Sequence, residues 1–182
     1  MMIAGKGIGR YSAAQLPDVI VAGDGTPRPV KEIARMGGAV WHAWTGLDID
    51  AYGGIEKEDA SWYGWVVSSG TLPALGPAFL GLGNPNLTNL GCNITTAASF
   101  SGGTSNCNGT NHWVTDITVG LWQNLYSGDI GRFTAGLQYE LISRKLFPGL
   151  STPVLGSPLI APSTNDNTVY TSLRWYPKYS TF

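Results

Sequence analysis

The 182-residue sequence has few charged side chains and no long hydrophobic run. Asp, Glu, Lys and Arg together make up 13% of the residues, about half of the fraction that soluble domains usually contain. No stretch approaches the roughly 18 to 20 consecutive apolar residues of a transmembrane helix. The eleven Lys and Arg residues are scattered and the formal net charge is −1, so nothing indicates a surface for nucleic acid. Low charge without a helical span is typical of a membrane β-barrel.

Motifs for catalysis and for metal or nucleotide binding are also missing. The two histidines, His42 and His112, each stand beside a tryptophan, and there is neither a Gly-x-Ser-x-Gly elbow nor a His-Glu-x-x-His helix. Residues 5–9 are rich in glycine but fail the spacing of a nucleotide-binding loop. We therefore expect no enzyme activity, no metal site and no cofactor. An outer-membrane hydrolase of the small-barrel type is the least favoured alternative.

The strongest positive signal is a two-residue alternation of apolar and polar side chains. It recurs in three separate segments, Trp113–Leu125, Arg132–Ile142 and Val169–Tyr176. A period of two predicts β-strands, because successive side chains of a strand point to opposite faces of its sheet. These segments are near the upper end for soluble strands and close to the ~9–11 residues that cross a bilayer at a tilt.

The whole pattern predicts an all-β fold, an antiparallel up-and-down meander that forms part of a transmembrane barrel. Five long strands are expected at 36–44, 47–58, 112–125, 132–146 and 167–176. Residues 1–35 are interpreted as an N-terminal loop segment with a small hairpin around Val19–Val21, and residues 36–182 as the barrel segment. Long loops at 60–111 and 147–166 alternate with short turns, which places every long loop on one side of the sheet, as in outer-membrane barrels. A soluble β-sandwich or barrel with uneven loops is the alternative.

The alternation also divides the side chains between two faces. We expect the following residues to face lipid: Leu47, Ile49, Ile117, Val119, Leu121, Phe133, Leu137, Tyr139, Leu173 and Trp175. We expect these to line a lumen: Asp48, Asp50, Tyr52, Asp116, Gln138, Glu140 and Arg174. Aromatic residues near the strand ends resemble the belts of membrane proteins. A lumen of mixed charge biases which ions pass, whereas a salt-bridged interior without any role in selectivity is the alternative.

Cys92 and Cys107 are the only cysteines, and both lie in the long polar loop. We expect a disulfide between them, because a metal site needs four ligands and no histidine lies close in the sequence. In the chain-entropy model, closing a loop of this size contributes about 3 kcal/mol. Two free thiols are the alternative.

Several segments resemble the C-terminal portion of Acidobacteria-type outer-membrane β-barrel proteins, which are porin-like. The segments are Gly7–Val19, Asp24–Thr26, Leu47–Gly54, Gly120–Gly128, Gly136–Leu141 and Asp166–Pro177. The resemblance implies a porin-like barrel in the bacterial outer membrane and supplies no catalytic residues.

Five strands are too few to close a barrel, and an open edge in a bilayer leaves unsatisfied backbone groups that cost several kcal/mol each. We therefore expect a C-terminal fragment whose partners are outer-membrane lipid and either missing N-terminal strands or copies of itself. The start, Met1–Gly7, shows no secretory signal, which agrees with a fragment. The expected function is passive solute passage or surface presentation. The alternative is a secreted, soluble β-sandwich binding module with a disulfide-closed loop.

Overall fold

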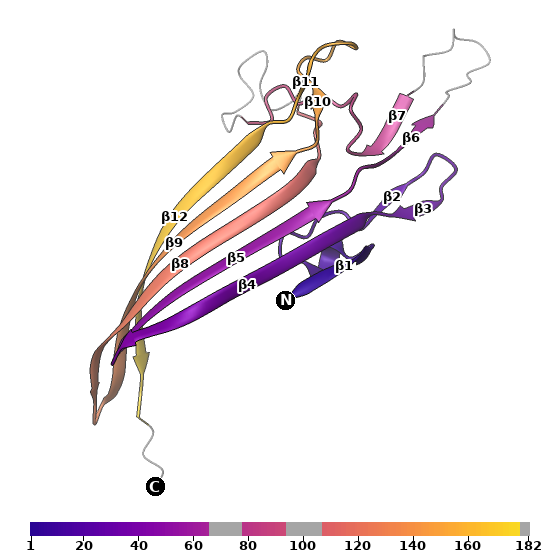
Figure 1. Cartoon of the computed structure of the whole chain (residues 1–182). Helices are drawn as coiled ribbons and strands as arrows, with labels where there is room; N and C mark the ends of the chain where they lie inside the picture. Colours follow the sequence, from indigo (N-terminus) through magenta and orange to yellow (C-terminus); the bar gives the residue numbers. More distant parts are fainter. Residues whose placement is uncertain (66–77, 94–106, 179–182) are drawn as a thin grey trace, which may run out of the picture.

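The computed structural model describes residues 1–65, 78–93 and 107–178, and it is dominated by one long, bowed antiparallel sheet (Figure 1). The strands of this sheet, in spatial order, are β1 (Met2–Lys6), β4 (Lys31–Trp44), β5 (Leu47–Glu58), β8 (Asn111–Gly128), β9 (Gly131–Leu146) and β12 (Ser163–Tyr176). The predicted all-β antiparallel fold is therefore confirmed. Among the described residues β1 and β12 form the two edges and do not pair with each other, so closure into a barrel stays a prediction.

The five predicted long strands are all present, and their boundaries differ mainly at the end with the long loops. β5 has the predicted bounds, whereas β4 begins at Lys31 and β12 at Ser163, before the predicted positions 36 and 167. Two-residue turns join β4 to β5 and β8 to β9. Gly46 in the first turn and Gly131, directly after the second, have φ angles of 90° and 114°, a backbone conformation that only glycine adopts without strain.

We predicted a loop with a small hairpin for the N-terminal segment 1–35, but this segment contains more regular structure. It contains the edge strand β1, the one-turn helix η1 (Gly9–Tyr11), the start of β4, and a hairpin of β2 (Val19–Val21) and β3 (Pro27–Pro29). The predicted hairpin is thus confirmed, but the sheet has a sixth, short strand. β1 is too short to show a periodic pattern, and it is stabilised by pairing with β4, which is distant in sequence.

All long connections lie at one end of the sheet, opposite the two short turns (Figure 1). The connection from β5 to β8 contains the hairpin β6 (Ser61–Trp65) and β7 (Ala78–Leu82), and the connection from β9 to β12 contains β10 (Gly149–Leu150) and β11 (Leu159–Ile160). The predicted loops at 60–111 and 147–166 are therefore partly built from short strands.

The buried apolar core is small and lies among these connections. Val30, Leu82 and Phe147 form it, and Ile20 packs against them. Within the described part of the chain the other three sheets have two strands each, so no second sheet of comparable size stacks on the large one. A β-sandwich requires such a second sheet, and one copy of the described chain does not supply it.

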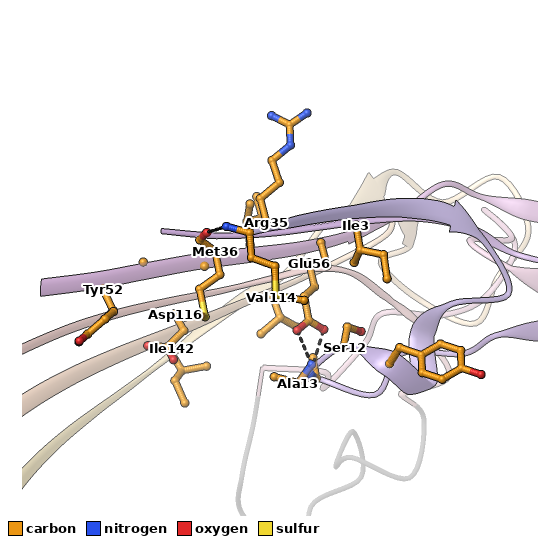
Figure 2. A pocket seen from close by; sticks show the side chains of 17 residues that line it. Ile3, Ser12, Ala13, Arg35, Met36, Tyr52, Glu56, Val114, Asp116 and Ile142 are labelled. Carbon is orange, nitrogen blue, oxygen red and sulfur yellow. Dashed lines mark hydrogen bonds between the residues drawn. The ribbon is translucent and has the colours of Figure 1, made fainter. Parts of the chain in front are cut away.

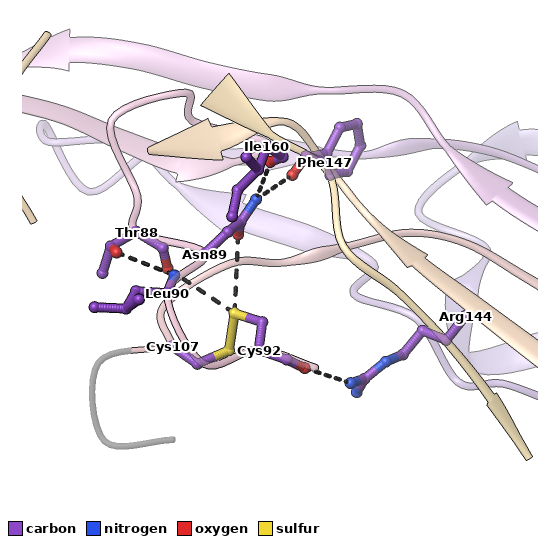
Figure 3. The surroundings of a disulfide bond; sticks show 8 residues. All are labelled: Thr88, Asn89, Leu90, Cys92, Cys107, Arg144, Phe147 and Ile160. Atoms are coloured by element: carbon purple, nitrogen blue, oxygen red, sulfur yellow. Dashed lines mark hydrogen bonds between the residues drawn. A yellow bond between two sulfur atoms is a disulfide. The ribbon is translucent and has the colours of Figure 1, made fainter. Parts of the chain in front are cut away.

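A buried asparagine ties the β5–β8 connection to the β9–β12 connection (Figure 3). The side chain of Asn89 is 1% exposed, and its Nδ2 donates hydrogen bonds to the carbonyl oxygens of Phe147 at 2.9 Å and Ile160 at 2.7 Å. Its backbone N–H donates to Leu150 O at 2.8 Å. Residues near 89 and near 150–160 therefore form one connected rim.

The predicted disulfide between Cys92 and Cys107 is present beside Asn89, with the two Cα atoms 4.9 Å apart (Figure 3). The guanidinium of Arg144 on β9 donates to Cys92 O at 3.4 Å. The disulfide therefore holds Cys107 beside Cys92, which contacts the large sheet through Arg144. The segment 94–106 between the two cysteines lies outside the described residues.

We predict that Asn89→Ala lowers the free energy of unfolding by about 1–3 kcal/mol, because the buried carbonyl of Phe147 and the partly buried carbonyl of Ile160 lose their donor. The urea midpoint measures this effect. Asn86→Ala is the matched control, since the hydrogen bond of Asn86 to Asn84 uses its backbone N–H and survives the substitution. Equal midpoints for the two variants would contradict the role given to Asn89.

Candidate functional site

The strand register divides the large sheet into two faces of different chemistry. Residues directly opposite each other in antiparallel strands share a face. Ala51, Val119, Tyr139 and Val169 are opposite one another across four strands, and so define an apolar face. All ten residues expected to face lipid lie on this face, and all seven expected to line a lumen lie on the other, which we call the polar face.

The apolar face is mostly uncovered, and Leu47 is its exception. Seven of the ten residues are 41–71% exposed, namely Ile117, Val119, Leu121, Leu137, Tyr139, Leu173 and Trp175. Ile49 and Phe133 are half-buried, and Leu47 is only 5% exposed. Leu47 pairs with Trp44 directly after the turn, where the register of β4 is irregular. Its position at this bulge removes Leu47 from the exposed apolar surface.

Charge is segregated by sign between the two faces. In the six strands the polar face carries eight acids, Glu32, Asp48, Asp50, Glu56, Glu58, Asp116, Glu140 and Asp166, and three arginines, Arg132, Arg144 and Arg174. The apolar face of these fully described strands carries no acid, but five basic residues, Lys6, Lys31, Arg35, Lys57 and Lys145. The polar face is thus of mixed charge, as expected, with an excess of acid.

Large side chains of the polar face lie flat against neighbouring glycines. A Cβ atom added to Gly38 would collide with the ring of Tyr52, and one added to Gly136 would collide with the ring of Trp122. The carboxylate of Asp50 lies over Gly120 in the same way, which leaves Asp50 only 8% exposed.

Arg174 continues this arrangement toward the edge strand. Its guanidinium lies 3.9 Å from the ring centroid of Trp122, a cation–π contact. These side chains of the polar face therefore lie along the sheet, against residues of the neighbouring strands.

The N-terminal segment 9–16 folds over the polar face near the long-loop end (Figure 2). The backbone N–H groups of Ala13 and Ala14 donate to the two carboxylate oxygens of Glu56 at 2.7 and 2.9 Å. Ser12 Oγ lies 2.9 Å from Glu32 Oε1. Glu32 and Glu56 both belong to the polar face, so two of its acids hold this segment in place.

A hollow of about 420 Å³ lies between this segment and the sheet (Figure 2). Its lining is mainly apolar, with Ile3, Ala13, Met36, Tyr52, Val114 and Ile142 among the lining residues, and it also includes the acids Glu56 and Asp116. Thr118 Oγ1 donates to Asp116 Oδ1 at 3.1 Å. This hollow can receive an apolar group and places carboxylates at its border.

Two glutamates form a buried pair at the long-loop end of the polar face. Glu58 is fully buried and lies directly opposite Glu32, which is 3% exposed. Within the described residues neither carboxylate oxygen of Glu58 has a hydrogen-bond partner. Burial, followed by the charges of Glu32 and Asp18, raises the pKa of Glu58 to about 8. Burial also raises the pKa of Glu32, so the pair retains a proton at neutral pH.

Sequence reasoning identified four acids of the polar face, Asp48, Asp50, Asp116 and Glu140. It missed Glu32, Glu56, Glu58 and Asp166, and also the segment that Glu32 and Glu56 hold. A signal exists in Glu56-Lys57-Glu58, where the sign of charge alternates with a period of two. That alternation indicates acids on one face and a lysine on the other. The contacts of Ala13 and Ala14 with Glu56 join residues more than forty positions apart, so no local pattern contains them.

A comparison of the chain with protein-family models, curated proteins and solved structures finds no match. No helix in the described ranges is long and apolar enough to cross a membrane. No group of three or more His, Cys, Asp or Glu side chains in those ranges is placed to hold a metal ion. Function must therefore be argued from the two faces of the sheet.

We predict that the buried pair makes stability fall as pH rises. Between about pH 4.5 and 8 folded Glu58 keeps a proton that the unfolded chain has released, so the free energy of unfolding decreases by up to about 1.4 kcal/mol per pH unit. Glu58→Gln should remove the contribution of Glu58 to this slope. At pH values above 8 the variant should have a higher urea midpoint than the unmodified chain. Asp129→Asn, at a fully exposed turn residue, should retain the slope. An unchanged slope in Glu58→Gln would refute this role.

Proposed function

We propose that this chain is a segment of a bacterial outer-membrane β-barrel that allows passive passage of small polar solutes and has no catalytic role. The observation that carries the proposal is the apolar face, where seven large residues are 41–71% exposed and no acid interrupts them. Exposed apolar patches that extend across a whole sheet indicate an interaction surface. Lipid is the partner that fits an apolar surface of this width.

The dimensions of the apolar face agree with those of a bilayer. Tyr126, Phe133 and Trp175 form an aromatic row near the short turns, with ring centroids 6.3 and 6.0 Å apart along the row. Trp113 and Lys145 form the corresponding row at the other end. From Phe133 to Lys145 the strand advances about 40 Å, which is about 30 Å along the membrane normal at a tilt of about 40°.

The two edge strands of the sheet need further strands to pair with them in a bilayer. β1 and β12 each have one side without a strand neighbour among the described residues. Backbone groups at such edges require partners in a bilayer. We propose that further strands of a longer protein, or a second copy of this chain, pair with these edges. The outer membrane is the proposed location.

The excess of acidic residues on the polar face gives the proposed passage a preference for cations. Rings of carboxylates in a lumen favour cations over anions. Segment 9–16 and the disulfide-linked rim narrow the mouth at the long-loop end. Surface presentation by this rim is the second role that the architecture permits, because the rim is built from connections that extend beyond the sheet.

A soluble binding module is the alternative, and the apolar hollow under segment 9–16 is the observation in its favour. Such a module would cover its apolar face by association of two copies in water. The experiments below distinguish it from the membrane proposal.

We predict opposite outcomes for two arginine substitutions at adjacent positions of β9. Leu137→Arg places a charge at the centre of the apolar face and should cost about 2–4 kcal/mol of stability in lipid, which prevents assembly into vesicles. Gln138→Arg changes the polar face and should be tolerated. Heat-modifiable mobility in gels and tryptophan quenching by brominated lipid measure insertion. Equal insertion of both variants, or folding of the unmodified chain without lipid or detergent, would contradict the proposal.

We also predict a cation preference in planar bilayers that contain the inserted chain. The double variant Asp116→Asn, Glu140→Gln should shift the reversal potential toward anions, since it removes two carboxylates from the polar face. The matched change Lys178→Gln, beyond β12, should leave the reversal potential unchanged. Insertion without any conductance would contradict passage and support surface presentation.

A further inference from the structure

Five basic residues gather on the apolar face next to the long-loop end, and we call them the basic row: Lys6, Lys31, Arg35, Lys57 and Lys145. Lys6 lies directly opposite Lys31 on the neighbouring strand. Lys57 and Lys145 flank Trp113 in a single row across β5, β8 and β9. Lysines from four different strands thus occupy two adjacent levels of the sheet.

The basic row contains more positive charge than the protein compensates. Like charges directly opposite each other in a sheet are destabilising, and the ammonium groups of Lys6 and Lys31 are in that arrangement. Lys31 has one partner, Asp59, with 3.1 Å between Nζ and Oδ2. Among the described residues no ion pair involves Lys6, Arg35, Lys57 or Lys145. An external anion would relieve this repulsion.

The surface at the basic row is hollowed. Lys6, Lys31, Lys57, Ile33 and Asp59 line an open depression of about 430 Å³. Nearby, burial lowers the pKa of His112, and the charges of Lys57 and Lys145 lower it further. The region is therefore positive, and it has room for an anionic group.

The basic row is continuous with the surface that we propose to contact lipid. This continuity favours a lipid headgroup over a free anion as the ligand. Val119 and Leu121 lie on the same face, nearer the short turns, and Trp113 marks the level where membrane proteins place interfacial aromatic side chains. Lysines at this level extend their ammonium groups to the headgroups while their aliphatic stems cover apolar surface.

We propose that the basic row binds the phosphate groups of a phosphorylated lipid headgroup, whose acyl chains lie along the apolar face. This inference rests on the proposed membrane function. The lipid belongs to the leaflet that adjoins the long connections. Attraction of anionic headgroups to clustered Lys and Arg, and contact of acyl chains with exposed Val and Leu, act together at this site.

The test uses the full chain inserted in phosphatidylcholine vesicles, with insertion measured first by heat-modifiable mobility. A bis-phosphorylated glycolipid and its enzymatically dephosphorylated form are the two probes, and Trp fluorescence reports binding. We expect at least about tenfold tighter binding of the phosphorylated lipid, with a strong decrease in high salt. The double variant Lys57→Gln, Lys145→Gln should lose most of this preference, whereas the control Arg132→Gln, on the polar face, should keep it.

The possible outcomes distinguish a failure of the lipid site from a failure of the proposed membrane function. Normal insertion with equal affinity for both lipids would overturn the lipid site and leave the membrane proposal intact. Failure of the unmodified chain to insert would overturn both. Saturation of the site by inorganic phosphate in lipid-free detergent, at the affinity of the lipid, would show a free-anion site instead. A cross-linked dimer that Lys57→Gln, Lys145→Gln abolishes would assign the basic row to a second copy.

Discussion

The pairing register of the five long strands is the constraint on which the rest of the structure depends. Because side chains alternate between faces, a slip of one residue between two strands would move every acid of one strand onto the apolar face. The two-residue turns with positive φ at Gly46 and Gly131 fix the register within two of the strand pairs. Polarity, sign of charge and the position of the aromatic rows all follow from this single alignment.

The sequence predicted the features that depend on local periodicity and missed those that depend on long-range pairing. The five strands and the two faces were predicted because each strand repeats the same alternation over many residues. β1 was missed because five residues contain too few repeats, and the burial of Glu58 was missed because the alternation assigns a residue to a face but not its exposure. Leu47 has the expected parity but is buried, since parity does not describe the irregular register beside a turn. The disulfide was predicted because only two cysteines exist.

The two ends of the sheet have different mechanical characters. At one end, the described residues form only two short turns and the end of β12. At the other end, Asn89, the Cys92–Cys107 disulfide and Arg144 join connections that are distant in sequence, and segment 9–16 attaches to Glu32 and Glu56 on the polar face. Hydrogen bonds to charged carboxylates are stronger than those between neutral groups. The two hydrogen bonds from Ala13 and Ala14 to the carboxylate of Glu56 therefore hold this segment on the polar face.

The glycines of the polar face have a consequence for how this chain can evolve. Each of Gly38, Gly120 and Gly136 leaves a gap that one neighbour, respectively Tyr52, Asp50 and Trp122, occupies across the strand pair. A mutation of either member alone produces a collision or an empty gap, whereas exchange of the two residues between the strands preserves the fit. In related sequences the members of each pair should therefore covary, and the large side chain should alternate between the two strands while the width of the inner surface is maintained.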